Sequence, residues 1–266
     1  MWRDLTIGMY VAGDSVIHRL AASTKILVTA LLMAAVFLVA SWPAMAVLTV
    51  LLALAYRLTG LPWGLMLAGM RPLLFILAIA LPLQVLLTAG EPWFYLGPLA
   101  VTGDALVQSG WLIFRLAALL FVTSLLTLTT SPVALADGLE GLLKPLERVK
   151  VPAHELAMII TIALRFIPLF SEEADKVSKA QKARGASLES GGLAQRLRSL
   201  VAILVPLLVG AFRRADELAV AMESRCYRGG QGRTRLHPET RDGRDWLALA
   251  VGLALFLLAV GERAGG

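Results

Sequence analysis

Cysteine and histidine are scarce in this chain of 266 residues. The single cysteine, Cys226, excludes an internal disulfide and every metal site built from several cysteines. The histidines, His18, His154 and His237, are far apart and lack the spacing of metal ligands. No G-x-x-x-x-G-K-[ST] motif occurs, so the chain is not expected to bind ATP through a phosphate-binding loop. We therefore expect no metal and no bound cofactor.

Charged residues are also few, at 17% of the chain, whereas hydrophobic residues make up 58%. This balance differs from that of soluble domains and indicates a protein of the lipid bilayer. Several apolar runs approach the roughly 20 residues that cross a hydrocarbon core. The sequence predicts an all-α, polytopic membrane protein with about five transmembrane helices. Their apolar runs are 26–40, 45–55, 73–87, 105–128 and 246–260.

The cations are unevenly distributed. Of the 25 Lys and Arg residues, 18 lie within residues 131–244, and the links 41–43 and 88–103 contain none. Because the cytosolic loops of membrane proteins collect Lys and Arg, we expect these two links outside the cell and residues 131–244 in the cytosol. The net charge of +6 therefore reflects membrane topology and does not predict a nucleic-acid partner.

Three regions follow from this topology. Residues 1–130 are expected to form a bundle of four spans with a cytosolic N-terminus. Residues 131–244 form a cytosolic domain of about three helices, and residues 245–266 form a last span that places the C-terminus outside the cell membrane. A single helix kinked at Pro43, in place of the first hairpin, would reverse the later orientations. The charge distribution favours the hairpin.

Two long helices of similar design are predicted in the cytosolic domain. Each starts with apolar residues, continues as an amphipathic helix and ends at an arginine, Arg184 in the first helix and Arg225 in the second. An offset of 41 residues aligns the two helices and superimposes these arginines. The apolar stretch of the second helix, 200–212, is too short to cross a membrane, which predicts a buried or interfacial position.

Arg184 and Arg225 have two interpretations. A cation at a helix end interacts favourably with the negative pole of the helix dipole, and Gly185 supplies the left-handed conformation that ends a helix. Each arginine is then a simple C-cap. A guanidinium also carries five donors in a rigid fork and a permanent charge, which suits docking into an acidic groove of a partner. Two such ends in one large cytosolic region favour docking.

Four segments carry a resemblance to a known family: GMYVAGDSVIHRLAASTK, TTSPVALADGLEGLLKPL, HELAMIITIALRFIPLFSEEADKVSKAQKARGA and AMESRCYRGG. Over nearly its whole length the chain resembles the transmembrane T component of energy-coupling factor (ECF) importers, the EcfT or CbiQ family. The signature Ala183-Arg184-Gly185 is the most specific part. The second signature of the family falls on Ser224-Arg225-Cys226, where only the arginine is kept. Cysteine tolerates positive φ poorly, which calls the left-handed geometry after this arginine into question.

The resemblance implies a non-catalytic coupling subunit of an ATP-driven importer. In that family the T component joins two cytosolic ABC-type ATPases, an EcfA-like pair that binds the ATP, to a small membrane protein, the S component, which binds a vitamin or a metal. The two signatures sit in grooves of the ATPases, which implies this role for Ala183, Arg184, Gly185, Ser224, Arg225 and Cys226. The apolar faces of the same helices hold the S component, and candidate contacts are Leu156, Ile160, Ile167, Leu204 and Leu208.

Two polar residues fall inside the predicted spans. Arg115 lies near the middle of the fourth span, and an ionisable group at that depth is a functional candidate. The alternative is a structural arginine bonded to Gln84, to a backbone carbonyl or to a hydroxyl. We favour the structural role, because a lone charge without an acidic partner is a poor relay for ions or protons. His18 is likewise expected to form a turn before the first helix.

Two other classes of function remain as alternatives. An integral membrane enzyme needs a nucleophile with a base, a metal cluster or a phosphate-binding loop. A stand-alone secondary transporter is expected to show inverted repeats and polar sites at the midplane. The sequence shows neither set of features. Co-purification discriminates the classes, because a coupling subunit brings down ATPases and a small apolar protein.

Overall fold

The computed structural model describes residues 10–88, 92–96, 99–145, 152–185, 192–229 and 241–265. Parts of the quoted segments, including residues 8 and 9, and also His237 lie outside these ranges. The chain divides into two compact units. The first, which we call the bundle unit, comprises residues 8–139 and 239–266, and the second, the lever unit, is formed chiefly by residues 140–238.

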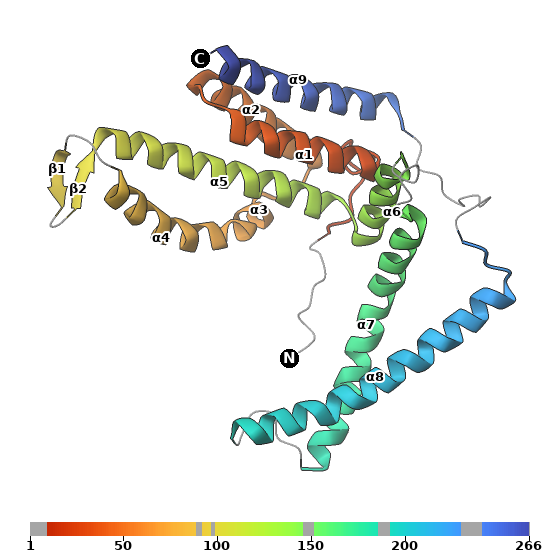
Figure 1. Cartoon of the computed structure of the whole chain (residues 1–266). Helices are drawn as coiled ribbons and strands as arrows, with labels where there is room; N and C mark the ends of the chain where they lie inside the picture. The colour runs from red at the N-terminus through yellow and green to blue at the C-terminus, as the bar shows by residue number, and fades with distance from the viewer. Residues whose placement is uncertain are drawn as a thin grey trace. The chain divides into compact units, whose positions relative to one another are not determined.

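The described residues are all-helical apart from one short antiparallel hairpin (Figure 1). The elements in chain order are α1 (Ala22–Leu38), α2 (Trp42–Thr59), α3 (Trp63–Gly69), α4 (Arg71–Leu87), β1 (Pro92–Leu96), β2 (Leu99–Thr102), α5 (Gly103–Thr129), α6 (Pro132–Leu143), α7 (Ala153–Ala183), α8 (Leu193–Ser224) and α9 (Gly243–Gly265). The five predicted apolar runs lie almost entirely within α1, α2, α4, α5 and α9, which confirms the polytopic all-α prediction.

The first two helices form a hairpin. The chain leaves α1 at Val39, whose φ of −56° and ψ of 125° end the helix. Ser41 then caps α2, because its Oγ accepts a hydrogen bond of 3.3 Å from the N–H of Ala44, and Pro43 occupies the first turn, where no N–H is needed. Residues 22–59 are therefore two helices, and the alternative of one helix kinked at Pro43 is wrong.

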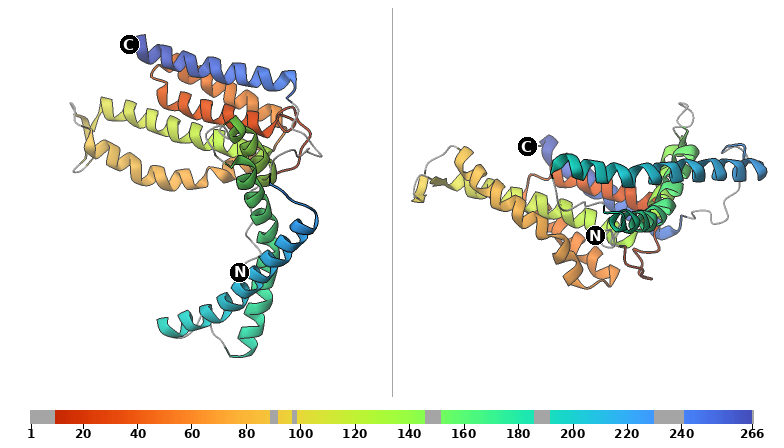
Figure 2. Two further views of the ribbon diagram at one scale, coloured as in Figure 1. Left: turned by 45° about the vertical axis from the view of Figure 1, so that its right-hand side comes forward. Right: turned by 90° about the horizontal axis from the view of Figure 1, so that it is seen from below.

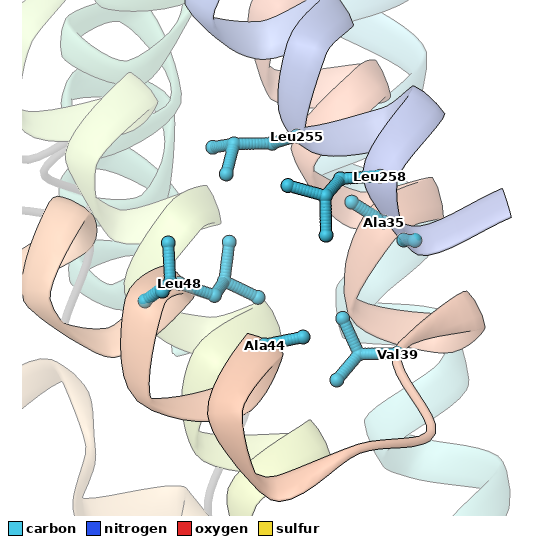
Figure 3. Close-up of a pocket in the computed structure, with 8 residues that line it drawn as sticks. Ala35, Val39, Ala44, Leu48, Leu255 and Leu258 are labelled. Atoms are coloured by element: carbon cyan, nitrogen blue, oxygen red, sulfur yellow. The ribbon is translucent and has the colours of Figure 1, made fainter. Parts of the chain in front are cut away.

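The core of the bundle unit lies between α1, α2, α5 and α9. Val36, Leu48 and Val122 are almost fully buried there, and the ring of Tyr56 packs against a tilted Trp63 and edge-to-face with Phe121, with ring centroids 4.6 and 5.7 Å away. A small apolar cavity remains between α1, α2 and α9 (Figure 3), and its lining includes Ala35, Val39, Ala44, Leu48, Leu255 and Leu258. This lining carries no charged group, so it indicates packing and not a ligand site.

Two buried charges hold helix ends of the bundle unit together. Lys25, 7% exposed, donates from Nζ to the carbonyls of His18 and Thr129 at 3.0 and 2.9 Å. Asp245, 2% exposed, accepts a 2.9 Å hydrogen bond at Oδ1 from the N–H of Ala21. The start of α1 is thus joined to the end of α5 and to the start of α9. Each charge is satisfied by backbone groups, among them the Thr129 carbonyl and the Ala21 N–H at helix ends.

Six described helical segments are long and apolar enough to cross a membrane by length and composition: α2, α3 with α4, α5, α7, α8 and α9. The sequence predicted about five, so the span count differs. Helix α1, at 17 residues, falls short of this length. Residues 200–212 belong to the 32-residue α8, and this helix as a whole meets the same criterion of length and composition although its apolar stretch alone is short.

Candidate functional site

The candidate partner-binding residues lie on α7 and α8, which both belong to the lever unit. The two helices pack against each other and cross (Figures 1 and 2). Helix α7 begins after Pro152, whose carbonyl accepts the N–H of Leu156 at 3.0 Å. Close to this start, Nδ1 of His154 lies 3.2 Å from Oε1 of Glu140 at the end of α6. The first turn of α7 is thereby attached to the element before it.

The end of α7 has the geometry that its sequence predicts. Arg184 is the C-cap, with φ −86° and ψ 7°, and its N–H donates to the carbonyl of Gln181 at 3.1 Å. Gly185 follows with φ 88°, and its N–H donates to the carbonyl of Lys182 at 3.0 Å. The left-handed glycine therefore stops the helix and satisfies one of its last carbonyls.

The end of α8 has the same geometry although its glycine is replaced. Arg225 is the C-cap, with φ −91° and ψ 14°, and Cys226 adopts a φ of 57°. The N–H of Cys226 donates to Glu223 at 2.9 Å, and the N–H of Tyr227 donates to Met222 at 3.0 Å. These two bonds form a Schellman motif. The geometry that the substitution called into question is therefore kept, at the cost of a left-handed non-glycine residue.

Both signatures are open to a partner. Ala183, Arg184 and Gly185 are exposed, and so are Ser224, Arg225 and Cys226. Neither arginine forms an ion pair with another described residue. The C-cap interpretation thus accounts for the backbone of the two arginines and assigns no role to their exposed guanidinium groups. Docking of these groups stays a prediction.

The apolar halves of α7 and α8 are also largely uncovered within the chain. Four of the five candidate S-component contacts are more than one third exposed, and Ile160 is half-buried. On α8 the exposed apolar side chains continue beyond the candidates Leu204 and Leu208 to Leu197, Val201, Val205 and Phe212. Such a surface needs cover from lipid or from an apolar partner.

A contact between α7 and α8 was missed by the sequence analysis. Nη2 of Arg214 lies 2.6 Å from Oε2 of Glu173, and the two side chains are each 29% exposed. The sequence did show that Glu173 and Arg214 are equivalent positions of opposite charge, because the offset of 41 residues that aligns the two terminal arginines also aligns them. Alignment alone did not show that the equivalent positions meet.

The two polar residues inside the bundle do not bind each other. Gln84 on α4 donates from Nε2 to Oε1 of Gln108 on α5 at 2.8 Å. The Arg115 guanidinium lies 5.9 Å from the ring centroid of Trp111, and its Nε has no hydrogen-bond partner among the described residues. The suggested bond from Arg115 to Gln84 is therefore wrong, and the arginine contacts an aromatic ring instead.

The segment before α1 forms the predicted turn. Nδ1 of His18 lies 2.6 Å from Oγ of Ser15, and its Nε2 lies 3.1 Å from the carbonyl of Val11. Gly13 packs on the imidazole, because a Cβ at this position would be 2.9 Å from the ring. His18 thus orders the turn. The described residues contain no group of His, Cys, Asp and Glu that could hold a metal ion.

Comparison with known proteins gives consistent matches. The sequence matches the CbiQ family, described as cobalt transport proteins, over residues 13–236. It is 50% identical over 260 residues to the energy-coupling factor transporter transmembrane protein EcfT of Thermosediminibacter oceani, covering 98% of this chain and 97% of that protein. The proteins of the same name from Heliobacterium modesticaldum and Bacillus subtilis are 46% and 42% identical, over 97% and 92% of this chain and 97% and 93% of their own lengths.

Proposed function

Because the chain belongs to the CbiQ family of cobalt transport proteins, we propose that it is the energy-coupling transmembrane subunit of an ATP-driven importer. It joins two cytosolic ATPase subunits to a small membrane protein, the S component, which binds the vitamin or metal. The ATPases bind and hydrolyse ATP. The chain itself is not an enzyme and holds no cofactor.

The observation that carries this proposal is the shared geometry of the two arginine-bearing helix ends. Arg184 and Arg225 are both exposed C-caps, followed by residues with φ of 88° and 57°. Two rigid helices that present the same fork of donors suit two similar acidic grooves, one in each ATPase. A rigid-body movement of either ATPase then displaces the helix attached to it.

The proposed arrangement places the chain in the cell membrane. The N-terminus and residues 131–244 lie in the cytosol and the C-terminus lies outside, because the Lys and Arg residues concentrate in 131–244. The exposed apolar faces of α7 and α8 hold the S component, with Leu156 and Ile167 on α7 and Leu204 and Leu208 on α8 among the contacts. The rest of the exposed apolar surface meets lipid.

Charge reversal at the two arginines tests this function. In Arg184→Glu and Arg225→Glu a carboxylate faces an acidic groove, and loss of a desolvated charge pair costs about 2–5 kcal/mol. We expect recovery of the ATPases with the tagged chain to fall at least about tenfold, since 1.4 kcal/mol is a factor of ten. The lysine variants should lose less, because they keep the charge but not the fork. Quantitative affinity purification from membranes measures all four.

Lys179→Glu is the matched control. Lys179 is exposed on α7, one and a half turns before Arg184, and its substitution changes the net charge equally. We expect near-normal recovery of the ATPases with this variant. If both arginine variants keep normal recovery and normal uptake, or if the control loses as much as they do, the arginines are not the docking groups.

The same purification separates this function from the two alternatives. A coupling subunit brings down two ATPase chains and a small apolar protein, which mass spectrometry of the intact complex identifies. An integral membrane enzyme or a secondary transporter is active as the isolated chain. Activity of the purified chain alone in liposomes therefore contradicts the proposal.

A further inference from the structure

The contact between Glu173 and Arg214 lies where α8 crosses α7, and we call these two residues the crossing pair. Besides the 2.6 Å ion pair, the Arg214 guanidinium lies over the ring of Phe170, 5.5 Å from its centroid. Gly210, one turn earlier on α8, leaves room for the carboxylate, because a Cβ there would be 3.2 Å from Oε1 of Glu173. The carboxylate therefore sits between the α8 backbone and a stacked guanidinium. Such a pair is less screened by salt than one between exposed charges.

The crossing pair occupies equivalent positions on the two helices. Glu173 lies eleven residues before Arg184, and Arg214 lies eleven residues before Arg225. At 1.5 Å per residue, each arm between the crossing and its terminal arginine is about 16 Å long. Figure 1 shows that the arginine ends of α7 and α8 lie on opposite sides of the crossing. The two arms are thus of equal length and extend in different directions.

Opposite charges at equivalent positions have a physical reason. When two helices of similar design cross symmetrically, equivalent residues meet at the crossing point. Two glutamates or two arginines would repel each other there, whereas one of each attract. Helices joined mainly by apolar contacts can also slide or rotate past one another, while a close ion pair specifies one register.

We propose that Glu173 and Arg214 are positioning residues that fix the point and the angle at which α7 and α8 cross. They thereby set the separation of Arg184 and Arg225, which themselves contact the partners. This inference rests on the proposed function, because a fixed separation matters only if the two ends are attached to two moving subunits. With the crossing fixed, displacement of one arm moves the other arm and the apolar faces together.

The geometric part is tested on the full-length chain in nanodiscs by distance measurements between nitroxide spin labels. One label is attached to Cys226, which is exposed and is the only cysteine of the chain. The other is attached to Ala180→Cys, an exposed position on the last turns of α7. The native pair should give one narrow distance peak. Glu173→Arg and Arg214→Glu should each lose this narrow peak, and the chain that carries both substitutions should regain it.

Two further variants keep this test decisive. Glu173→Gln preserves shape without charge and should broaden the peak even if Glu173→Arg does not fold. The exchange of Glu172 and Arg213, exposed neighbours that are also equivalent by the offset of 41, is the matched control and should leave the peak unchanged. An unchanged native peak in the single variants overturns the proposal, and so does a double exchange that fails to restore the peak.

The functional part uses the complete complex in liposomes. The single variants should still recover both ATPases, because Arg184 and Arg225 are intact, but should import less substrate per ATP hydrolysed, and the double exchange should restore this ratio. If the single variants broaden the distance peak but still import the native amount of substrate per ATP hydrolysed, the positioning role is overturned. If the native chain recovers no ATPases, the proposed function fails, whereas the distance measurement still decides whether the pair fixes the crossing.

Discussion

The bundle unit buries large side chains such as Val36, Leu48 and Tyr56 almost completely, whereas the side chains buried on α7 and α8 within the described residues are Ala153, Ala157, Ser199 and Ile203. Both regions are long apolar helices with many exposed apolar side chains, but only the bundle unit also has a core of large buried side chains among the described residues. The lever unit leaves its apolar halves and its two terminal arginines uncovered. The proposed function accounts for this difference, because the S component and the ATPases would cover these surfaces of α7 and α8.

The two units also differ in how deeply the charged residues discussed above are buried. In the bundle unit, Lys25 and Asp245 are buried and bound to backbone groups at helix ends. In the lever unit, Glu173 pairs with Arg214 at an intermediate depth, and Arg184 and Arg225 are exposed. The two buried charges of the bundle unit thus stabilise its fold, whereas the terminal arginines of the lever unit face outward. Substitutions should therefore affect folding in one unit and assembly in the other.

The largest effect is expected at Gly138 of α6. A Cβ at this position would lie 2.7 Å from the backbone N of Ser23 and 2.8 Å from the backbone carbon of Ala22, and backbone atoms cannot move aside as a side chain can. We expect Gly138→Leu to destabilise the chain by about 3 kcal/mol or more. Thermal unfolding of the purified protein, followed by size-exclusion chromatography, measures this change.

Gly110→Leu on α5 is the matched control. A Cβ at Gly110 meets nothing within 4 Å, and both glycines lie inside helices where leucine is the better helix former. The control should unfold at the native temperature or above it. Equal melting temperatures for the two variants would contradict the close approach of α6 to α1.

A second pair of substitutions compares a buried leucine of the bundle unit with an exposed leucine of the lever unit. Leu48 is 2% exposed in the bundle unit, and Leu208 is 54% exposed on α8. Leu48→Ala leaves a cavity and should cost about 2–4 kcal/mol of stability, whereas Leu208→Ala should change stability by less than about 0.5 kcal/mol. Co-purification should show the reverse order, with loss of the small membrane partner only for Leu208→Ala. Similar destabilisation by both variants would remove the distinction between the units.

The helices of both units could be predicted from the sequence, because apolar runs and helix ends are local signals. The five apolar runs predicted α1, α2, α4, α5 and α9, and the arginines marked the ends of α7 and α8. Two short elements were not predicted, the seven-residue α3 and the hairpin of β1 and β2. Elements of a few residues carry too little periodicity to be recognised.

The partners of individual side chains could not be predicted. Gln84 binds Gln108 because α4 packs on α5. Arg115 lies over Trp111, and this contact depends on the side-chain conformations within α5. The pairing of Glu173 with Arg214 depends on where two helices cross, which a sequence offset does not specify. The length of α8 agrees with the helix predicted up to Arg225, but its apolar stretch alone did not show that the whole helix is apolar enough to cross a membrane.

The smallest predicted effect compares the two arginine-bearing ends with each other. Cys226 has a φ of 57° and Gly185 a φ of 88°, and a left-handed conformation costs a residue with a Cβ about 1 kcal/mol more than it costs glycine. Cys226→Gly should therefore stabilise the end of α8 slightly, and Gly185→Ala should destabilise the end of α7 by a similar amount.

Hydrogen exchange followed by mass spectrometry can resolve these changes, because the Tyr227 and Gly185 amides donate to the last turns of the two helices. The Tyr227 amide should exchange more slowly in Cys226→Gly, and the Gly185-to-Lys182 bond should open more often in the chain with Gly185→Ala. Both ends keep exposed arginines, so recovery of the ATPases should stay near normal in Cys226→Gly. Faster exchange at Tyr227 in that variant would show that the cysteine side chain stabilises the Schellman motif, and the equivalence of the two ends would then be limited to their arginines.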